Sequence, residues 1–286
     1  MIYAIAHAVR LAFPAPVWEQ HCELRLAPRA SEHQRVVAVT LELEPPAEPR
    51  AHVDGFGNPV HAFDLLAPHD AIVARIRARV ETTLANPFDY PLVPPAAERA
   101  WLADALRSEP RLWDYTLHRS AATPDFAALG LACPPRDPAR PLLDALRAVL
   151  DWTDEQLAVA PGFALAATPL ADALRAGHGN GQDLTHLLIS VARAWGAPAR
   201  YAMGYCDPDN DEDEDAPTTL HAWAEILVPG AGWRGLDPTA RLVTNDTYVT
   251  VALGRDAFDC PPIRSHAKGA ADAAATTTTL EVTRDQ

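Results

Sequence analysis

The most constraining stretch of this chain is GNGQDLTH at residues 179–186, because it opens a strongly periodic helix. Apolar residues follow it at helical spacing: Leu184, Leu187, Leu188, Val191 and Trp195. Gly196 and Pro198 then end the pattern. We therefore predict a helix from about Gly181 to Trp195 with one apolar face turned to a core.

Position 181 is the chemically sensitive point of that helix. The first backbone N–H groups of a helix have no partner within it, and the helix dipole there favours negative charge. A cysteine so placed would have a lowered pKa, and the same N–H groups could hold an oxyanion. Gly181 has no side chain, so the stretch predicts a nucleophile site that lacks its nucleophile. A plain helix-start glycine is the simpler interpretation, since glycine is tolerated near an N-cap.

A second stretch predicts a hairpin with a charged pair. HAWAE at residues 221–225 and GWRGLDPT at residues 232–239 flank a Pro-Gly turn, and the midpoint between His221 and Asp237 falls on Pro229. With a tight turn there, His221 and Asp237 lie opposite each other, with Cβ atoms about 5 Å apart. An imidazole beside a carboxylate is the base and orienting group of a catalytic triad, although a plain structural pair is the alternative.

The first part of the chain has the period of strands. Strands are predicted at residues 2–11, 21–26, 35–43, 60–65 and 72–80, with a turn at 54–59. Pro14 and Pro16 are expected to break the first strand. Closely spaced strands suggest a small sandwich or barrel, and the proline-rich segment 86–95 indicates a boundary. We therefore place a β-sandwich-like domain at residues 1–90.

The period then changes to that of an α+β core at residues 91–256. Helices are expected at 96–106, 111–117 and 142–152, with a capping box at 153–156 and a helix that starts at Thr168-Pro169 and ends at Gly177. Strands are expected at 200–205, 221–228, 233–236 and 247–253. In the tail, 257–286, residues 270–279 are predicted to be a mobile segment or loop, and 280–283 a last strand that returns to the N-terminal domain.

Composition excludes several classes of partner. The chain has 24 Lys and Arg against 38 Asp and Glu, a net charge of −14, which argues against nucleic acid and anionic membranes. No apolar stretch is long enough for a membrane span and the start lacks a signal-peptide pattern, so we expect a cytoplasmic protein. The four cysteines contain no CxxC pair.

Metal sites are weakly supported by the sequence. His178 and His186 flank the helix start and could join His221, but no pair has i, i+4 spacing. The acidic loop 207–215 fails the EF-hand template, because Glu212 and Thr218 stand where glycine and glutamate are required. We therefore expect no metal and no cofactor.

The combined motifs resemble those of the bacterial transglutaminase-like family. The family pattern GxCQD[FL]xH, ARYxxGY, HAWxE and GWxxxDPT is matched at residues 179–186, 199–205, 221–225 and 232–239, with glycine in place of the cysteine. DGFGN at 54–58 and VALGRD at 251–256 resemble further family blocks. The resemblance implies an N-terminal β domain and a papain-like core, in which a central helix packs on an antiparallel sheet and a Cys-His-Asp triad acts on amide bonds.

Carried over residue by residue, the resemblance makes His221 the base and Asp237 the orienting carboxylate, and its nucleophile position falls on Gly181. Asn180, Gln182 and Trp223 are the candidate binding residues, although a tryptophan in such a hairpin is more often a packing residue. Cys206 is the alternative thiol, but the neighbouring acidic loop should raise its pKa.

Three functions remain open at this point. The first is a non-catalytic homologue that binds a peptide or protein. The second is a hydrolase or transferase of altered mechanism, with His221 activating water, which should be slow without a covalent intermediate. The third is an amide-directed acyltransferase or cysteine peptidase whose nucleophile was removed. The sequence does not determine the substrate or the oligomeric state.

Overall fold

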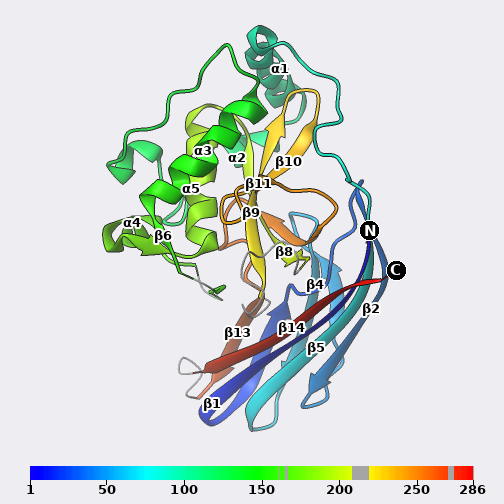
Figure 1. Ribbon diagram of the computed structural model, residues 1–286. Helices are drawn as coiled ribbons and strands as arrows, with labels where there is room; N and C mark the ends of the chain where they lie inside the picture. The colour runs from blue at the N-terminus through cyan, green and yellow to red at the C-terminus, as the bar shows by residue number, and fades with distance from the viewer. Residues whose placement is uncertain (161, 165–166, 208–218, 270–273, 286) are drawn as a thin grey trace.

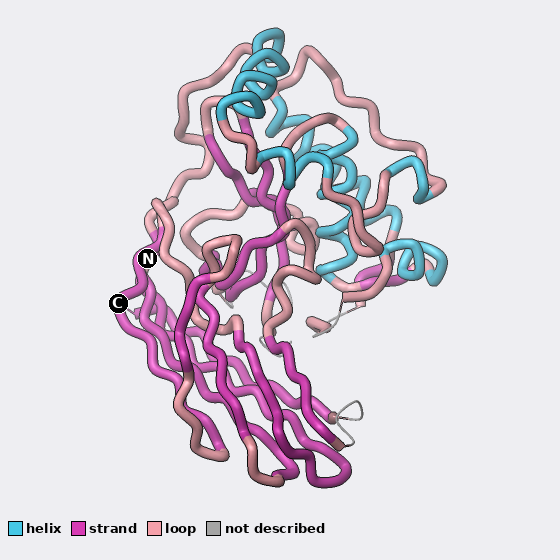
Figure 2. The backbone as a smooth tube through the Cα atoms, turned by 180° about the vertical axis from the view of Figure 1, so that it is seen from behind, coloured by secondary structure: helices cyan, strands magenta, loops and turns pink. Residues whose placement is uncertain are grey.

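The protein is built from two sheets, one bare and curled and one covered by helices (Figures 1 and 2). The computed structural model describes residues 1–160, 162–164, 167–207, 219–269 and 274–285. The predicted fold class, an N-terminal β domain joined to a papain-like α+β core, is confirmed. One continuous apolar core runs through both parts, since Tyr3 and Val80 of the curled sheet belong to the same buried cluster as Leu184 and Leu188 of the core.

The curled sheet has seven strands in the order β2-β5-β1-β4-β3, with β13 and β14 also paired to β1. All of its pairings are antiparallel, and β1 runs through its whole length. The strands are β1 (Ile2–Leu24), β2 (Gln34–Glu44), β3 (Arg50–Val53), β4 (Pro59–Leu65), β5 (His69–Thr82), β13 (Ile263–Lys268) and β14 (Ala275–Asp285).

The prediction that Pro14 and Pro16 break the first strand is wrong. β1 continues to Leu24, and its register with β5 shifts between Ala12 and Val17. Both prolines are exposed within this irregular segment. A proline has no N–H to donate to a ladder, so it is tolerated where the ladder is already interrupted.

The tail also differs from its prediction. Residues 275–279, expected in a loop, form the first half of β14, which pairs with β1 from Ala275↔Ala12 to Asp285↔Ile2. The alanine and threonine repeat looked like low complexity, but threonine is a good strand former, and the free edge of β1 supplies the partner. Residues 270–273 lie outside the described part of the chain.

The core sheet has five antiparallel strands in the order β11-β10-β9-β8-β12. They are β8 (Ala199–Cys206), β9 (His221–Val228), β10 (Gly232–Asp237), β11 (Leu242–Val243) and β12 (Tyr248–Gly254). The helical segments are α1 (Pro95–Ser108), α2 (Leu112–Leu117), a 3-10 turn (Phe126–Leu129), α3 (Leu142–Gln156), α4 (Leu170–Ala176) and α5 (Gly181–Ala194). β6 (Ala158–Val159) and β7 (His178–Gly179) form a short parallel pair before α5.

Helix α5 is buried on all sides, not on one face as its apolar stripe predicts. Every residue from Gln182 to Arg193 is buried, because the core sheet covers one side and helices cover the others. The stripe residues Leu184, Leu187, Leu188 and Val191 are fully buried. No helix in the described ranges is both long and apolar enough to cross a bilayer.

Two predicted helix boundaries are shifted. α4 is capped by Pro169, and the Thr168 hydroxyl donates instead to Asp183 Oδ1 at 3.1 Å. α3 continues through residues 153–156 rather than restarting there, and the Thr153 hydroxyl donates to the Leu150 carbonyl at 2.7 Å. Side chains in helices commonly bond to carbonyls in the preceding turn, so the capping-box pattern is not specific to a helix start.

The predicted turn at residues 54–59 joins the two sheets. Asn58 accepts from Leu253 N at 2.8 Å and donates to Leu253 O at 2.7 Å, as a strand neighbour would. Gln34 does the same at Thr250, accepting from its N–H and donating to its carbonyl at 2.7 Å each. These two amides fix β12, and therefore the core sheet, against the N-terminal domain.

Candidate functional site

The N-terminus of α5 is held by a complete capping box. Asn180 Oδ1 accepts from the N–H groups of Gln182 and Asp183 at 2.9 and 3.2 Å, and Asp183 Oδ2 accepts from Asn180 N at 2.9 Å. Gly179 is required by this arrangement, since a Cβ there would lie 2.8 Å from the Asp183 carboxylate. Asn180, predicted as a binding residue, therefore fixes the start of the helix.

The space beside Gly181 is occupied by a hydroxyl. A Cβ at position 181 would lie 2.8 Å from Thr239 Oγ1, which is closer than carbon and oxygen normally approach. That hydroxyl is buried and has no hydrogen-bond partner within the described residues. Thr239 comes from the loop after β10, so the hairpin closes the space at the start of α5.

The hairpin register differs from the prediction. Val228 pairs with Gly232 and Ala224 with Leu236, so the turn is centred on Gly230 rather than on Pro229. Gly230 and Gly232 both have positive φ, 80° and 76°, which allows a three-residue turn. His221 and Asp237 are consequently diagonal neighbours on one face of the sheet, still within reach of each other.

The two side chains nevertheless meet. His221 Nε2 lies 2.5 Å from Asp237 Oδ2. The same carboxylate accepts from the Tyr248 hydroxyl at 2.8 Å, and Oδ1 accepts from the N–H groups of Thr239 and Ala240 at 2.8 and 3.2 Å. Asp237 is completely buried and has four donors, which satisfies a buried carboxylate.

Charge is stabilised on both partners of this pair. Burial acts to lower the pKa of His221, but the charge and hydrogen bond of Asp237, with a smaller effect of Cys206, raise it well above its ordinary value. Burial acts to raise the pKa of Asp237, but His221, Tyr248 and Ala240 together lower it. The structure therefore favours an imidazolium–carboxylate ion pair at neutral pH.

Cys206 is the thiol beside this pair. Gly204 of β8 pairs with His221 of β9, so Cys206 lies two residues along on the same face, and its thiol is a hydrogen-bonding neighbour of the imidazole. It is buried, and it packs in a small apolar cluster with Trp223 and Tyr248. Cys206, His221 and Asp237 thus lie in a row across three adjacent strands.

The other two predicted binding residues are both buried. Gln182 Oε1 accepts from Ala164 N at 2.9 Å, and its amide lies 3.4 Å from the Tyr201 hydroxyl. Trp223 is 1% exposed and lies over the backbone of two glycines, since a Cβ at Gly204 or Gly235 would come within about 3 Å of the indole. Both side chains support the walls of the site in this structure.

The three histidines considered for a metal site lie in different surroundings. His178 is exposed, whereas His186 is fully buried, stacks on Tyr201 at 5.2 Å and has its pKa lowered to about 4 by burial. The described residues contain no group of three side chains placed to hold a metal ion. Of the acidic loop, only Asp207 lies inside the described part of the chain.

Sequence reasoning assigned no role to Thr239 and Tyr248. Thr239 is the last residue of the GWxxxDPT motif, so the sequence already places it two residues after Asp237. Its contact with Gly181, however, depends on how the hairpin packs on α5. Tyr248 opens β12, which is separated from β9 by β8, and no local pattern places its hydroxyl on Asp237.

Comparison with known proteins identifies both halves of the chain. The family model for the bacterial transglutaminase-like N-terminal region matches residues 3–81, and that for the transglutaminase-like superfamily matches residues 134–238. An uncharacterized protein of Mycobacterium tuberculosis is 30% identical over 275 residues, covering 92% of this chain and 86% of its own. A Mycobacterium leprae protein, also uncharacterized, is 28% identical over 276 residues, which is 94% of each chain.

A solved structure shares the whole fold. A candidate cysteine protease from Cytophaga hutchinsonii superposes with a TM-score of 0.75 at 20% identity, covering 99% of this chain and 90% of its own. At that identity the likeness concerns the fold alone. Because the family models and the 30% identical relative together span nearly the whole sequence, the chain belongs to the bacterial transglutaminase-like family.

Proposed function

We propose that this protein is a non-catalytic member of its family that binds a peptide or a protein segment beside the N-terminus of α5. The observation that carries the proposal is the pairing of Gly181 with the Thr239 hydroxyl, which occupies the space that a side chain at 181 would need. A side chain at 181 would be the best-placed nucleophile for acyl transfer through a covalent intermediate, because the helix N–H groups there could hold an oxyanion.

A groove next to Gly181 supports the binding role. It has a volume of about 490 Å³ and is lined by residues that precede and open α5, including Phe163, Asp172, His178 and Asn180. An aromatic ring among polar and acidic side chains suits an extended peptide that is neutral or basic. The net charge of −14 favours the same kind of partner.

Direct activation of water by His221 is a weaker candidate. A general base needs a free lone pair on the imidazole, and Asp237 opposes its deprotonation by raising the pKa of His221. Asp237 engages Nε2 at 2.5 Å, which leaves Nδ1 as the ring nitrogen that could accept a proton. The remaining enzymatic candidate uses Cys206, the thiol beside His221, as the nucleophile.

One set of variants separates these functions. All are made with Cys133→Ser, because Cys133 is an exposed thiol that would react with any probe. Transfer of a fluorescent primary amine to a glutamine peptide, and hydrolysis of that peptide, are then measured for the parent, Gly181→Cys, Gly181→Cys with Thr239→Ala, and Cys206→Ser. We expect no turnover by the parent or by Cys206→Ser, and thiol labelling at 181 that is fastest when Thr239 is also truncated. Turnover by the parent that Cys206→Ser abolishes would make the protein an enzyme and overturn the proposal.

Binding is tested on a peptide array with matched charge reversals. Asp172→Arg changes the groove, whereas Asp151→Arg changes an exposed aspartate on α3 outside it. We expect the parent and Asp151→Arg to select the same peptides, and Asp172→Arg to lose basic ones at least tenfold. Equal binding by all three proteins, or binding by none, would contradict the groove assignment.

A further inference from the structure

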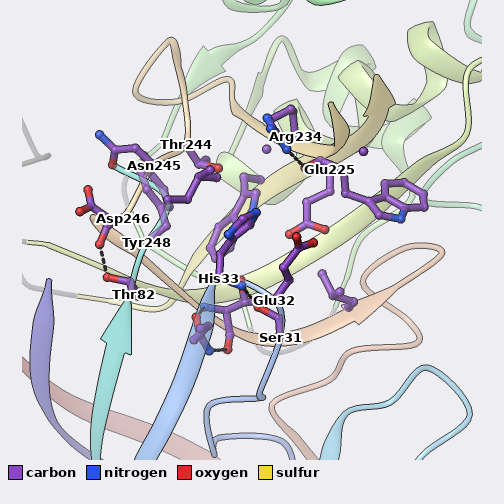
Figure 3. Close-up of a pocket in the computed structure, with 18 of the residues that line it drawn as sticks. Ser31, Glu32, His33, Thr82, Glu225, Arg234, Thr244, Asn245, Asp246 and Tyr248 are labelled. Carbon is purple, nitrogen blue, oxygen red and sulfur yellow. Dashed lines mark hydrogen bonds between the residues drawn. The ribbon is translucent and has the colours of Figure 1, made fainter. Parts of the chain in front are cut away.

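A separate hollow of about 300 Å³ lies where the N-terminal domain meets the core sheet (Figure 3). The segment after β1, including Arg29 and Glu32, forms one wall. Arg200, Glu225 and Trp233 of strands β8 to β10 form the other. Its volume is at the lower end of the range for small-molecule sites, and such sites often lie between domains.

Two of the arginines that line the hollow, Arg29 and Arg200, lie close enough to repel each other. Arg200 is paired with Glu225, with Nη2 and Nε 2.6 and 2.8 Å from one carboxylate oxygen, and lies 3.9 Å over the ring of Trp233. Arg29 has no carboxylate partner among the described residues; its Nη1 donates to Asn58 Oδ1 at 3.3 Å, and its Nε is buried without a partner. Burial, and then repulsion by Arg200, lower the pKa of Arg29. Arg29 therefore lies beside Arg200 without an ion pair of its own among the described residues.

Negative groups face the same space. Glu32 and Glu225 project toward each other from opposite walls of the hollow (Figure 3). Arg200 bonds only to Oε2 of Glu225, and within the described residues Oε1 has no donor. Glu32 is exposed and has no ion-pair partner in the described ranges. These carboxylate oxygens can accept hydrogen bonds from a cationic group.

We propose that this hollow binds a small zwitterion, a free α-amino acid with an apolar side chain. Its carboxylate lies toward Arg29 and Arg200, and its ammonium group lies between Glu225 and Glu32. The lining carries three arginines and three acidic side chains: Arg29, Arg200, Arg234, Glu32, Glu225 and Asp246. A ligand with both charges therefore matches the hollow better than a simple anion or a simple cation. Leu84, Trp223 and Leu253 supply the apolar lining for its side chain.

A ligand bound in this hollow would connect the N-terminal domain to the core, because the hollow lies between them. The arginine and glutamate on each side come from different halves of the chain, so a bound zwitterion adds contacts across the junction that Asn58 and Gln34 already fix. A ligand that binds the folded state alone raises the melting temperature. The proposal is independent of the peptide groove, which lies at the start of α5 and shares no lining residue with this hollow.

The test is thermal unfolding of the full chain with each standard α-amino acid and with two analogues of leucine. 4-Methylpentanoate lacks the ammonium group, and isoamylamine lacks the carboxylate. We expect leucine or another apolar amino acid to raise Tm by about 5 °C at a hundredfold excess over its Kd, and both analogues to leave Tm unchanged. No shift with any amino acid, or an equal shift with an analogue, overturns the proposal.

Variants assign the shift to the hollow. Glu32→Gln removes an exposed carboxylate from its wall, and Glu48→Gln removes an exposed carboxylate elsewhere as the matched control. Isothermal titration with the amino acid that binds should show at least a tenfold weaker Kd for Glu32→Gln and an unchanged Kd for Glu48→Gln. Arg29→Met should abolish binding, and Arg29→Lys, which keeps the charge, should retain part of it. Equal Kd values for Glu32→Gln and Glu48→Gln would place the ligand elsewhere.

Discussion

The two halves of the candidate site differ greatly in how much they contribute to the stability of the fold. At the N-terminus of α5, Gly181 has no side chain, and the hydroxyl beside it has no hydrogen-bond partner in the described structure. At the hairpin, Asp237 is fully buried and accepts from an imidazole, a phenol and two backbone N–H groups. The charged half is thus part of what holds β9, β10 and β12 together. It can persist after a nucleophile is lost, so its presence says little about turnover.

The largest expected effect is that of Asp237→Ala. The change leaves His221, Tyr248 and two N–H groups without their acceptor, and breaking a buried pair in this way costs about 3–5 kcal/mol of folding free energy. Urea unfolding measures the loss. Asp237→Asn keeps the shape and one acceptor oxygen, and should lose only about half as much. A loss below about 1 kcal/mol for Asp237→Ala would show that the pair is not a structural element.

His221→Gln should give a smaller effect with a defined pH dependence. The pKa of His221 is raised in the folded state, so its contribution is complete below the unfolded value of about 6.5 and is lost as pH rises through the folded pKa. The pKa of Asp237 is lowered, so its contribution disappears in acid as pH falls through the folded value.

We therefore expect His221→Gln to cost about 2 kcal/mol near pH 6, and less as pH rises. Unfolding in urea across pH measures the difference from the parent. His7 and His186 are buried with pKa values lowered to about 4, and they also affect acid stability, but they are present in both proteins and cancel in the difference. A difference that grows with pH would contradict the ion-pair assignment.

Tyr248→Phe removes one donor and keeps the ring. The phenol donates to a carboxylate, a kind of hydrogen bond worth about 1.5–3 kcal/mol, and Asp237 keeps its other donors. We expect a loss of about 1.5 kcal/mol in urea unfolding, and a smaller one when Asp237 is already asparagine. An unchanged loss in that background would mean that the hydroxyl acts elsewhere.

Much of this arrangement could be predicted from the sequence, because it follows from the local spacing of residues. Helix α5, strands β8 and β9 and the pairing of His221 with Asp237 all follow from spacing, although the hairpin was misplaced because Gly230 and Gly232 permit a three-residue turn. β14 was partly missed because strand formation there depends on a partner 263 residues earlier in the register, Ala12 for Ala275. The roles of Thr239 and Tyr248 depend on packing between elements, which no local pattern encodes.

The smallest expected effect tests whether the residue at position 181 affects the free energy of unfolding at all. Alanine at a helix start is favoured over glycine by up to about 1 kcal/mol, but a Cβ at 181 would lie 2.8 Å from Thr239 Oγ1. We expect Gly181→Ala to destabilise the parent by about 0.5 kcal/mol and to stabilise Thr239→Ala by about the same amount, a coupling of about 1 kcal/mol between two touching residues. A double-mutant cycle in urea measures it. Additive effects would mean that the hydroxyl moves aside freely, so that position 181 could accept a side chain without a change elsewhere in the fold.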